Sequence, residues 1–104
     1  MTASNTTRTL AKLRADGYTA AVSERWNPHA GIRQDLFGFI DVVALGDGYT
    51  LGVQACSYSG ISARVRKIAD HDNIAAVRKA NWRIEVWGWR KVGHRWTVRV
   101  VDVS

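Results

Sequence analysis

Residues 37–56 read FGFIDVVALGDGYTLGVQAC, and this stretch decides the fold. Its first half is apolar on both faces except at Asp41, which predicts a central strand over residues 37–45 that is buried on both sides. The second half resumes the strand pattern. Asp47-Gly48 between two such runs is the preferred two-residue hairpin turn, in which both positions favour positive φ. The stretch therefore predicts an antiparallel hairpin whose register can be counted from the turn.

Counting back from this turn pairs Val42 with Val53 and Asp41 with Gln54. The pleat then places Asp41 and Gln54 side by side on one face, with their Cβ atoms about 5 Å apart. A buried, ionised carboxylate is unfavourable unless it is compensated, and an amide donor compensates only part of the penalty. Two interpretations follow. The pair is either a structural hydrogen bond or part of a divalent-cation site, whose preferred ligands are carboxylate and carbonyl oxygens; we favour the cation site.

Two further acidic residues precede this hairpin in the sequence. Glu24 ends a predicted strand over residues 18–24, and Asp35 lies six residues before Asp41. We expect Glu24 to be the better second ligand, because a strand fixes the direction of its side chain. For Asp35, a surface or capping charge and a functional carboxylate are equally good interpretations.

The remaining elements are predicted from periodicity and from turn residues. We expect helices over residues 4–16, 61–69 and 74–80, a loop over residues 26–34, and strands over residues 82–89 and 95–103. This order indicates a single α+β domain over residues 1–104, with a mixed central sheet flanked by helices. Of the five tryptophans, at least three are expected in the core or at a dimer face, and Trp26 is expected nearest the active face.

The predicted elements follow one another in a definite order: a helix, a strand containing GFID (residues 38–41), a hairpin, a strand containing VQAC (residues 53–56) and a basic helix. This arrangement resembles the PD-(D/E)XK, or restriction-endonuclease-like, nuclease superfamily, above all its small Holliday-junction-resolvase-like and phage endonucleases. The resemblance implies an αβββαβ core with one extra C-terminal strand. It also implies a homodimer, and a bacterial or phage-encoded protein that acts in the cytoplasm.

The resemblance further implies that Asp41 and Gln54, joined by Glu24, bind Mg²⁺ or Mn²⁺ and take part in hydrolysing DNA phosphodiester bonds. Cys56 stands where the superfamily has a lysine, and a neutral thiol cannot stabilise charge at a phosphate. Lys67, on the following helix, is the preferred substitute cation. Residues expected to contact the nucleic acid are Arg33, Ser57, Ser59, Arg64 and Lys67.

Charge supports a polyanionic partner. The chain has 104 residues, with 15 Lys and Arg against 9 Asp and Glu, and its net charge is +6. Residues 61–104 carry the whole excess, mostly as arginine, whose planar guanidinium suits phosphate. A single cysteine, Cys56, excludes an intramolecular disulfide, and no apolar run is long enough for a membrane span, so we expect a soluble intracellular protein.

Three functions are compatible with these patterns. The first is a metal-dependent DNA endonuclease, acting on branched or otherwise structured DNA. The second is a catalytically degenerate module of the same fold that binds nucleic acid without cutting it, because Gln54 and Cys56 replace charged residues of the motif. The third is an unrelated β-rich scaffold in which Asp41 and Gln54 form only a structural pair.

Overall fold

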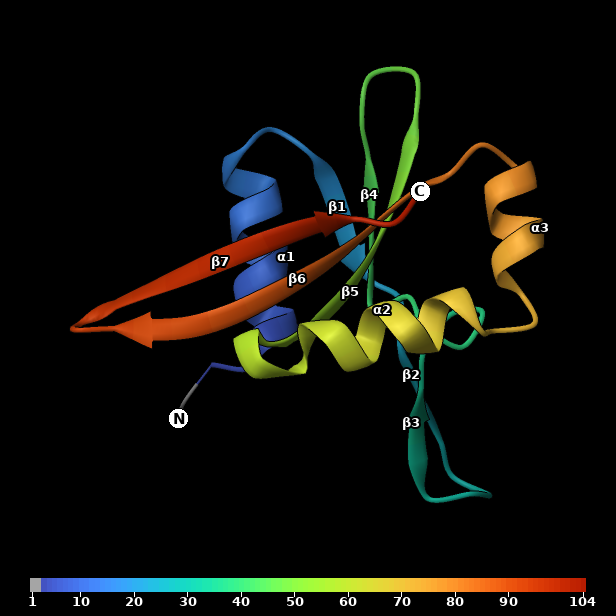
Figure 1. Cartoon of the computed structure of the whole chain (residues 1–104), viewed down its shortest axis with the longest axis horizontal. Coiled ribbons are helices and arrows are strands. Elements are labelled where there is room, and N and C mark those ends of the chain that lie inside the picture. The colour runs from blue at the N-terminus through green and yellow to red at the C-terminus, as the bar shows by residue number, and fades with distance from the viewer. Residues whose placement is uncertain (1–2) are drawn as a thin grey trace.

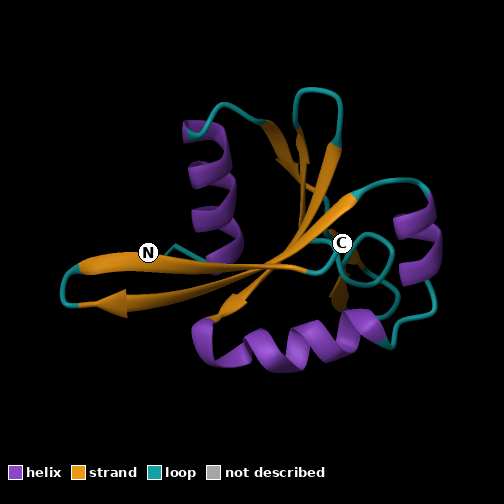
Figure 2. Cartoon of the chain, turned by 45° about the horizontal axis from the view of Figure 1, so that its top comes forward, coloured by secondary structure: helices purple, strands orange, loops and turns teal. Residues whose placement is uncertain are grey.

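The computed structural model describes residues 3–104, which form a mixed five-stranded sheet between two helical layers (Figures 1 and 2). The helical segments are α1 (Asn5–Ala15), the 3-10 turn η1 (Tyr58–Gly60), α2 (Ile61–Ala69) and α3 (Ile74–Lys79). The strands of the main sheet are β1 (Thr19–Val22), β4 (Val42–Leu45), β5 (Thr50–Ser57), β6 (Arg83–Val92) and β7 (Arg95–Asp102). A separate two-stranded sheet consists of β2 (Arg25–Asn27) and β3 (Ile32–Gln34).

The main sheet has the order β1–β4–β5–β6–β7. Neighbouring strands are antiparallel except β5 and β6, which are parallel because α2 and α3 connect them. The predicted α+β class, with a mixed central sheet flanked by helices, is confirmed. None of the helices in residues 3–104 combines the length and the apolar character that crossing a membrane requires.

The sheet has a hydrophobic core on each face, and Figure 2 shows helices on both sides. On one face, Leu13 of α1 packs with Trp87 and Trp89. On the other face, Ile68 of α2 packs in a cluster that includes Phe39. Removing these side chains from water on both faces is the main stabilisation of the fold and fixes α2 against the sheet.

The hairpin of β4 and β5 has the predicted register. Val42 pairs with Val53, and the Gly46 amide donates to the Tyr49 carbonyl at 2.9 Å. One detail of the prediction is wrong, because only Gly48 of the two turn residues has a positive φ, of 82°. A single left-handed glycine is enough to reverse the chain here.

The apolar run over residues 37–45 is not one strand. Leu36 pairs with Ile40 across a tight turn in which Phe37 has φ 56° and Gly38 φ 92°. Glycine is favoured at position 38 for two reasons. The backbone there is left-handed, and a Cβ would overlap the His71 ring. Regular pairing in β4 therefore starts at Val42.

The predicted loop over residues 26–34 is wrong, because this segment is the hairpin of β2 and β3. Asn27 closes the turn, since its side chain accepts hydrogen bonds from the His29 and Ala30 amides and its carbonyl accepts from Gly31. The first strand also ends earlier than predicted, at Val22, so that Glu24 lies in the link between β1 and β2. The β2–β3 hairpin projects from the body of the molecule (Figure 1).

The tryptophans divide as predicted between core and surface. Trp87 and Trp89 are buried and Trp82 packs against the core, whereas Trp26 and Trp96 are exposed. Trp89 donates from its indole nitrogen to the buried Thr9 hydroxyl at 2.8 Å, which ties α1 to the sheet. The two exposed tryptophans lie on different hairpins.

Substitution of Gly88 is expected to loosen the contact between β6 and α2. A Cβ at this position would overlap the Ile61 side chain and lie 3.2 Å from Cα of Tyr58. We expect Gly88→Ala to lower the free energy of unfolding by about 1–3 kcal/mol in urea denaturation, because the backbone of η1 has to move. Adding Ile61→Val, which removes the overlapping Cδ1 atom, should restore part of the loss. An unchanged denaturation midpoint for Gly88→Ala would contradict this packing.

Candidate metal centre

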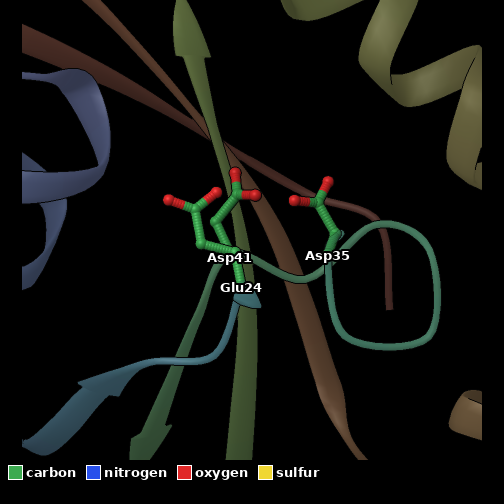
Figure 3. Close-up of side chains that lie close together, drawn as sticks. All are labelled: Glu24, Asp35 and Asp41. Atoms are coloured by element: carbon green, nitrogen blue, oxygen red, sulfur yellow. The ribbon is translucent and has the colours of Figure 1, made fainter. Parts of the chain in front are cut away.

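Three carboxylates from three separate segments meet at one end of the sheet. Glu24, Asp35 and Asp41 each offer a carboxylate oxygen, and these oxygens lie within 4.8 Å of one another. Figure 3 shows the three side chains turned to the same side. Glu24 precedes β2, Asp35 follows β3 and Asp41 precedes β4. The structure thus brings Glu24 to Asp41, as the sequence indicated, and adds Asp35; we call these three residues the acidic cluster.

Asp41 is the buried member of the acidic cluster, with 4% of its surface exposed. Its Oδ2 atom accepts hydrogen bonds from the Gln54 side-chain amide and from the Ala55 backbone amide, both at 2.8 Å. Burial, together with the hydrogen bond and the charge of Asp35, raises the pKa of Asp41 to about 7, although the donors from Ala55 and Gln54 act in the opposite direction. Asp41 is therefore a carboxyl group whose ionisation is opposed by its neighbours.

Gln54 lies next to Asp41 on the sheet, as predicted, and only 3% of it is exposed. Its amide nitrogen faces the acidic cluster: besides donating to Asp41, Nε2 lies 3.5 Å from Oδ2 of Asp35. Its amide oxygen accepts from Lys67 Nζ at 3.4 Å. In this orientation Gln54 holds Asp41 in place, and ligation of a cation by the amide oxygen requires the amide to turn over. Coordination by Gln54 stays a prediction.

Lys67 brings a positive charge to the acidic cluster. Because α2 buries Ile61 and Ile68, Lys67 reaches toward β5, and its Nζ lies 3.7 Å from Oδ2 of Asp35. Cys56 is buried two residues beyond Gln54 on the same face, and burial raises the pKa of its thiol. The neutral thiol cannot supply the charge of a lysine, whereas Lys67 is close enough to do so.

Of the other residues that were expected to contact nucleic acid, one lies beside the acidic cluster and three lie away from it. Arg33 Nη1 lies 3.6 Å from Oε1 of Glu24, so Arg33 belongs to the surroundings of the acidic cluster. Ser57 is the last residue of β5 and Ser59 lies in η1, with their hydroxyl oxygens 3.3 Å apart, and Arg64 is exposed on α2. Within residues 3–104, no hydrogen bond or ion pair joins Ser57, Ser59 or Arg64 to the three acids.

An open cavity of about 470 Å³ lies beside the acidic cluster. Its lining includes Arg33, Asp35, Lys67, His71 and Asn73. Two cationic side chains therefore border the same space as a carboxylate, which suits an anionic group that is bridged to the acids by a cation. His71 and Asn73 were not predicted for the site. The His71 ring can approach because residue 38 is glycine, and the Asn73 side-chain amide donates to the Phe37 carbonyl at 3.0 Å.

Comparison of the chain with family models, with curated proteins and with solved structures found no match. A functional assignment therefore depends on the chemistry of the site itself. Three carboxylates, one amide and one ammonium group lie close together, and two of these groups, Asp35 and Lys67, also line the cavity.

The raised pKa of Asp41 is expected to make the protein less stable as the pH rises when no cation is present. The folded protein keeps the proton of Asp41 up to about pH 7, whereas the unfolded chain loses it near the ordinary value of 3.8. Between these values the folded state binds more protons, so the free energy of unfolding falls with rising pH and levels off above the folded-state pKa.

Asp41→Asn resembles the protonated carboxyl and removes this loss. In urea denaturation with EDTA, we expect the variant to exceed the wild type by on the order of 1–3 kcal/mol at about pH 8. The difference should shrink as the pH is lowered toward 4. Parallel pH profiles for the two proteins would contradict the raised pKa.

Proposed function

We propose that the protein is a metal-dependent DNA endonuclease of the PD-(D/E)XK type, which uses Mg²⁺ or Mn²⁺ to hydrolyse phosphodiester bonds. The observation that carries the proposal is the convergence of Glu24, Asp35 and Asp41 beside Lys67. The order α1, β1, β4, β5, α2, β6 also agrees with the αβββαβ core that the resemblance implies. In this reading the β2–β3 hairpin is an insertion between the first two strands of the core.

The acidic cluster fits a divalent cation on chemical grounds. Its donors are carboxylate oxygens, which Mg²⁺ and Mn²⁺ prefer over nitrogen or sulfur ligands. The buried carboxylate of Asp41 is hard to ionise next to Asp35, and a dication would relieve that repulsion. Glu24 and Asp35, each partly exposed, would complete the ligand set on the open side.

The bound cation would supply an acidified water and neutralise charge at the scissile phosphate. Lys67 would stabilise the charge that develops on the phosphate oxygens, because its ammonium group stands at the edge of the cluster. The side-chain amide of Gln54 would fix the positions of Asp41 and Lys67 relative to each other, because it donates to the first and accepts from the second. Arg33 and the basic face of α2 would bind the nucleic-acid backbone in a sequence-independent and salt-sensitive way.

A binding module that does not cut is the second candidate function. The orientation of Gln54 favours it, because the amide oxygen is occupied by Lys67 and the amide nitrogen faces the carboxylates. The neutral Cys56 at the usual lysine position favours it as well. The same basic surface would then hold nucleic acid without hydrolysis.

Cleavage assays separate the two functions. Purified protein is incubated with supercoiled plasmid and with single-stranded, duplex and branched oligonucleotides, in Mg²⁺, in Mn²⁺ and in EDTA. We expect nicking or strand cleavage with either cation and none with EDTA. Salt-sensitive binding without cleavage of any substrate would favour the binding module, and the absence of both binding and cleavage would contradict both functions.

A further inference from the structure

The β2–β3 hairpin carries a tryptophan that the core does not use. The hairpin projects below the body of the molecule in Figure 1, and Trp26 on β2 is 58% exposed. An indole that is left in water on a protruding element loses the stabilisation that burial gives most tryptophans. A contact with a ligand would recover that stabilisation.

Trp26 lies on the same face of the hairpin as the acidic cluster. It pairs directly with Arg33, and directly paired residues of an antiparallel ladder point to one face. Glu24 flanks β2 two residues before Trp26, and Asp35 flanks β3 two residues after Arg33, so the alternation of the hairpin, continued by one residue beyond each strand, gives these side chains the same direction. The contact of 3.6 Å between Arg33 Nη1 and Glu24 Oε1 agrees with this arrangement.

The spacing along β2 suits a nucleic-acid strand. Two residues of a strand span about 7 Å, and stacked nucleotides follow one another at about 3.4 Å. Measured along the backbone, Trp26 is therefore about two stacked nucleotides from Glu24. Arg33, whose side chain is 67% exposed, lies opposite Trp26 and offers a guanidinium to a phosphate on the same face.

We propose that Trp26 stacks on an unpaired nucleobase of the strand whose phosphate lies at the acidic cluster, so that the protein selects single-stranded or branched nucleic acid over continuous duplex. The inference rests on the proposed function for the position of the phosphate. Aromatic side chains stack on any base, but a base inside a duplex is covered on both faces and must first be unpaired and unstacked, which costs a few kcal/mol. Duplex nucleic acid would therefore gain little from Trp26.

Binding without hydrolysis tests this inference. Fluorescence anisotropy, in Ca²⁺ to neutralise the acidic cluster and in EDTA for comparison, measures the affinity of the full chain for a labelled single strand of about 20 nucleotides and for the matching duplex. We expect Trp26→Ala to weaken single-strand binding about 5- to 100-fold and duplex binding less than about twofold. Trp26→Phe, which keeps an aromatic face, should retain most of the affinity.

Trp96→Ala is the matched control, because Trp96 is also exposed but lies on β7 under the guanidinium of Arg8, 3.4 Å from the ring centroid. The inference would be overturned by equal losses on the single strand and the duplex, by an equal loss in Trp96→Ala, or by a wild type that binds neither substrate. A change of oligomeric state in Trp26→Ala with unchanged affinity would also overturn it and assign the hairpin to a protein contact. A selective loss in a protein that cleaves nothing would uphold stacking and refute hydrolysis.

Discussion

Asp41→Asn is expected to lower metal-dependent cleavage about a thousandfold, equivalent to about 4 kcal/mol of transition-state stabilisation. The substituted side chain still offers an oxygen to the amides of Gln54 and Ala55, which donate to Asp41 at 2.8 Å in the wild type. It no longer carries the charge that would hold a divalent cation between Glu24 and Asp35. The variant should therefore fold normally and fail in catalysis.

Two measurements distinguish this loss from a loss of folding. Titration calorimetry with Mn²⁺ should give heat of binding for the wild type and little for Asp41→Asn, and Mn²⁺ should raise the melting temperature only of the wild type. Asp47→Asn is the matched control, because it removes an exposed carboxylate from the turn of the same hairpin. Cleavage by Asp41→Asn at the rate of the control would show that the acidic cluster is not the catalytic centre.

The pair of Asp41 and Gln54 could be predicted because it depends on local rules. Once Asp47-Gly48 is identified as the turn, the ladder fixes every later pair, and the structure has Val42 opposite Val53 as counted. Helix α2 was predictable for a similar reason. Its apolar spacing buries Ile61 and Ile68 and leaves Lys67 directed toward the site.

The turn over residues 36–40 could not be predicted from periodicity. A run of large apolar residues looks the same whether it forms a buried strand or a buried turn. The one local signal was Gly38, and its significance lies in the ring of His71, which is distant in sequence. The beginning of β4 was therefore placed several residues too early.

The β2–β3 hairpin was missed because an exposed hairpin has no buried face to impose alternation on the sequence. Trp26 and Ile32 are both exposed, so apolar residues do not mark an interior here. The signal that remained was the turn chemistry of Asn27 and Gly31. Recognising that turn would have paired Arg25 with Gln34 and placed Asp35 beside Glu24, which is the part of the site that sequence reasoning left open.

Lys67→Met is expected to lower the rate of cleavage about 10²- to 10³-fold while metal binding is retained or becomes tighter, because an electrostatic donor to the transition state is lost. Lys67 Nζ lies 3.7 Å from Asp35 and 3.4 Å from the Gln54 oxygen, so its removal leaves the carboxylates in place and makes their surroundings more negative. The effect should appear in the turnover number, measured with saturating substrate, and not in the affinity for Mn²⁺.

Lys79→Met is the matched control, because it removes the same charge from the exposed end of α3. Loss of that charge weakens only the general attraction of nucleic acid, so the control should shift the Michaelis constant with salt and leave turnover within about twofold of the wild type. Equal turnover in the two variants would mean that Lys67 binds substrate without acting on the reacting phosphate. A drop in turnover confined to Lys67→Met would instead show that Lys67 acts on the reacting phosphate. Its ammonium group, which reaches the acidic cluster from α2, would then replace the lysine that the nuclease superfamily has at the position of Cys56 on β5.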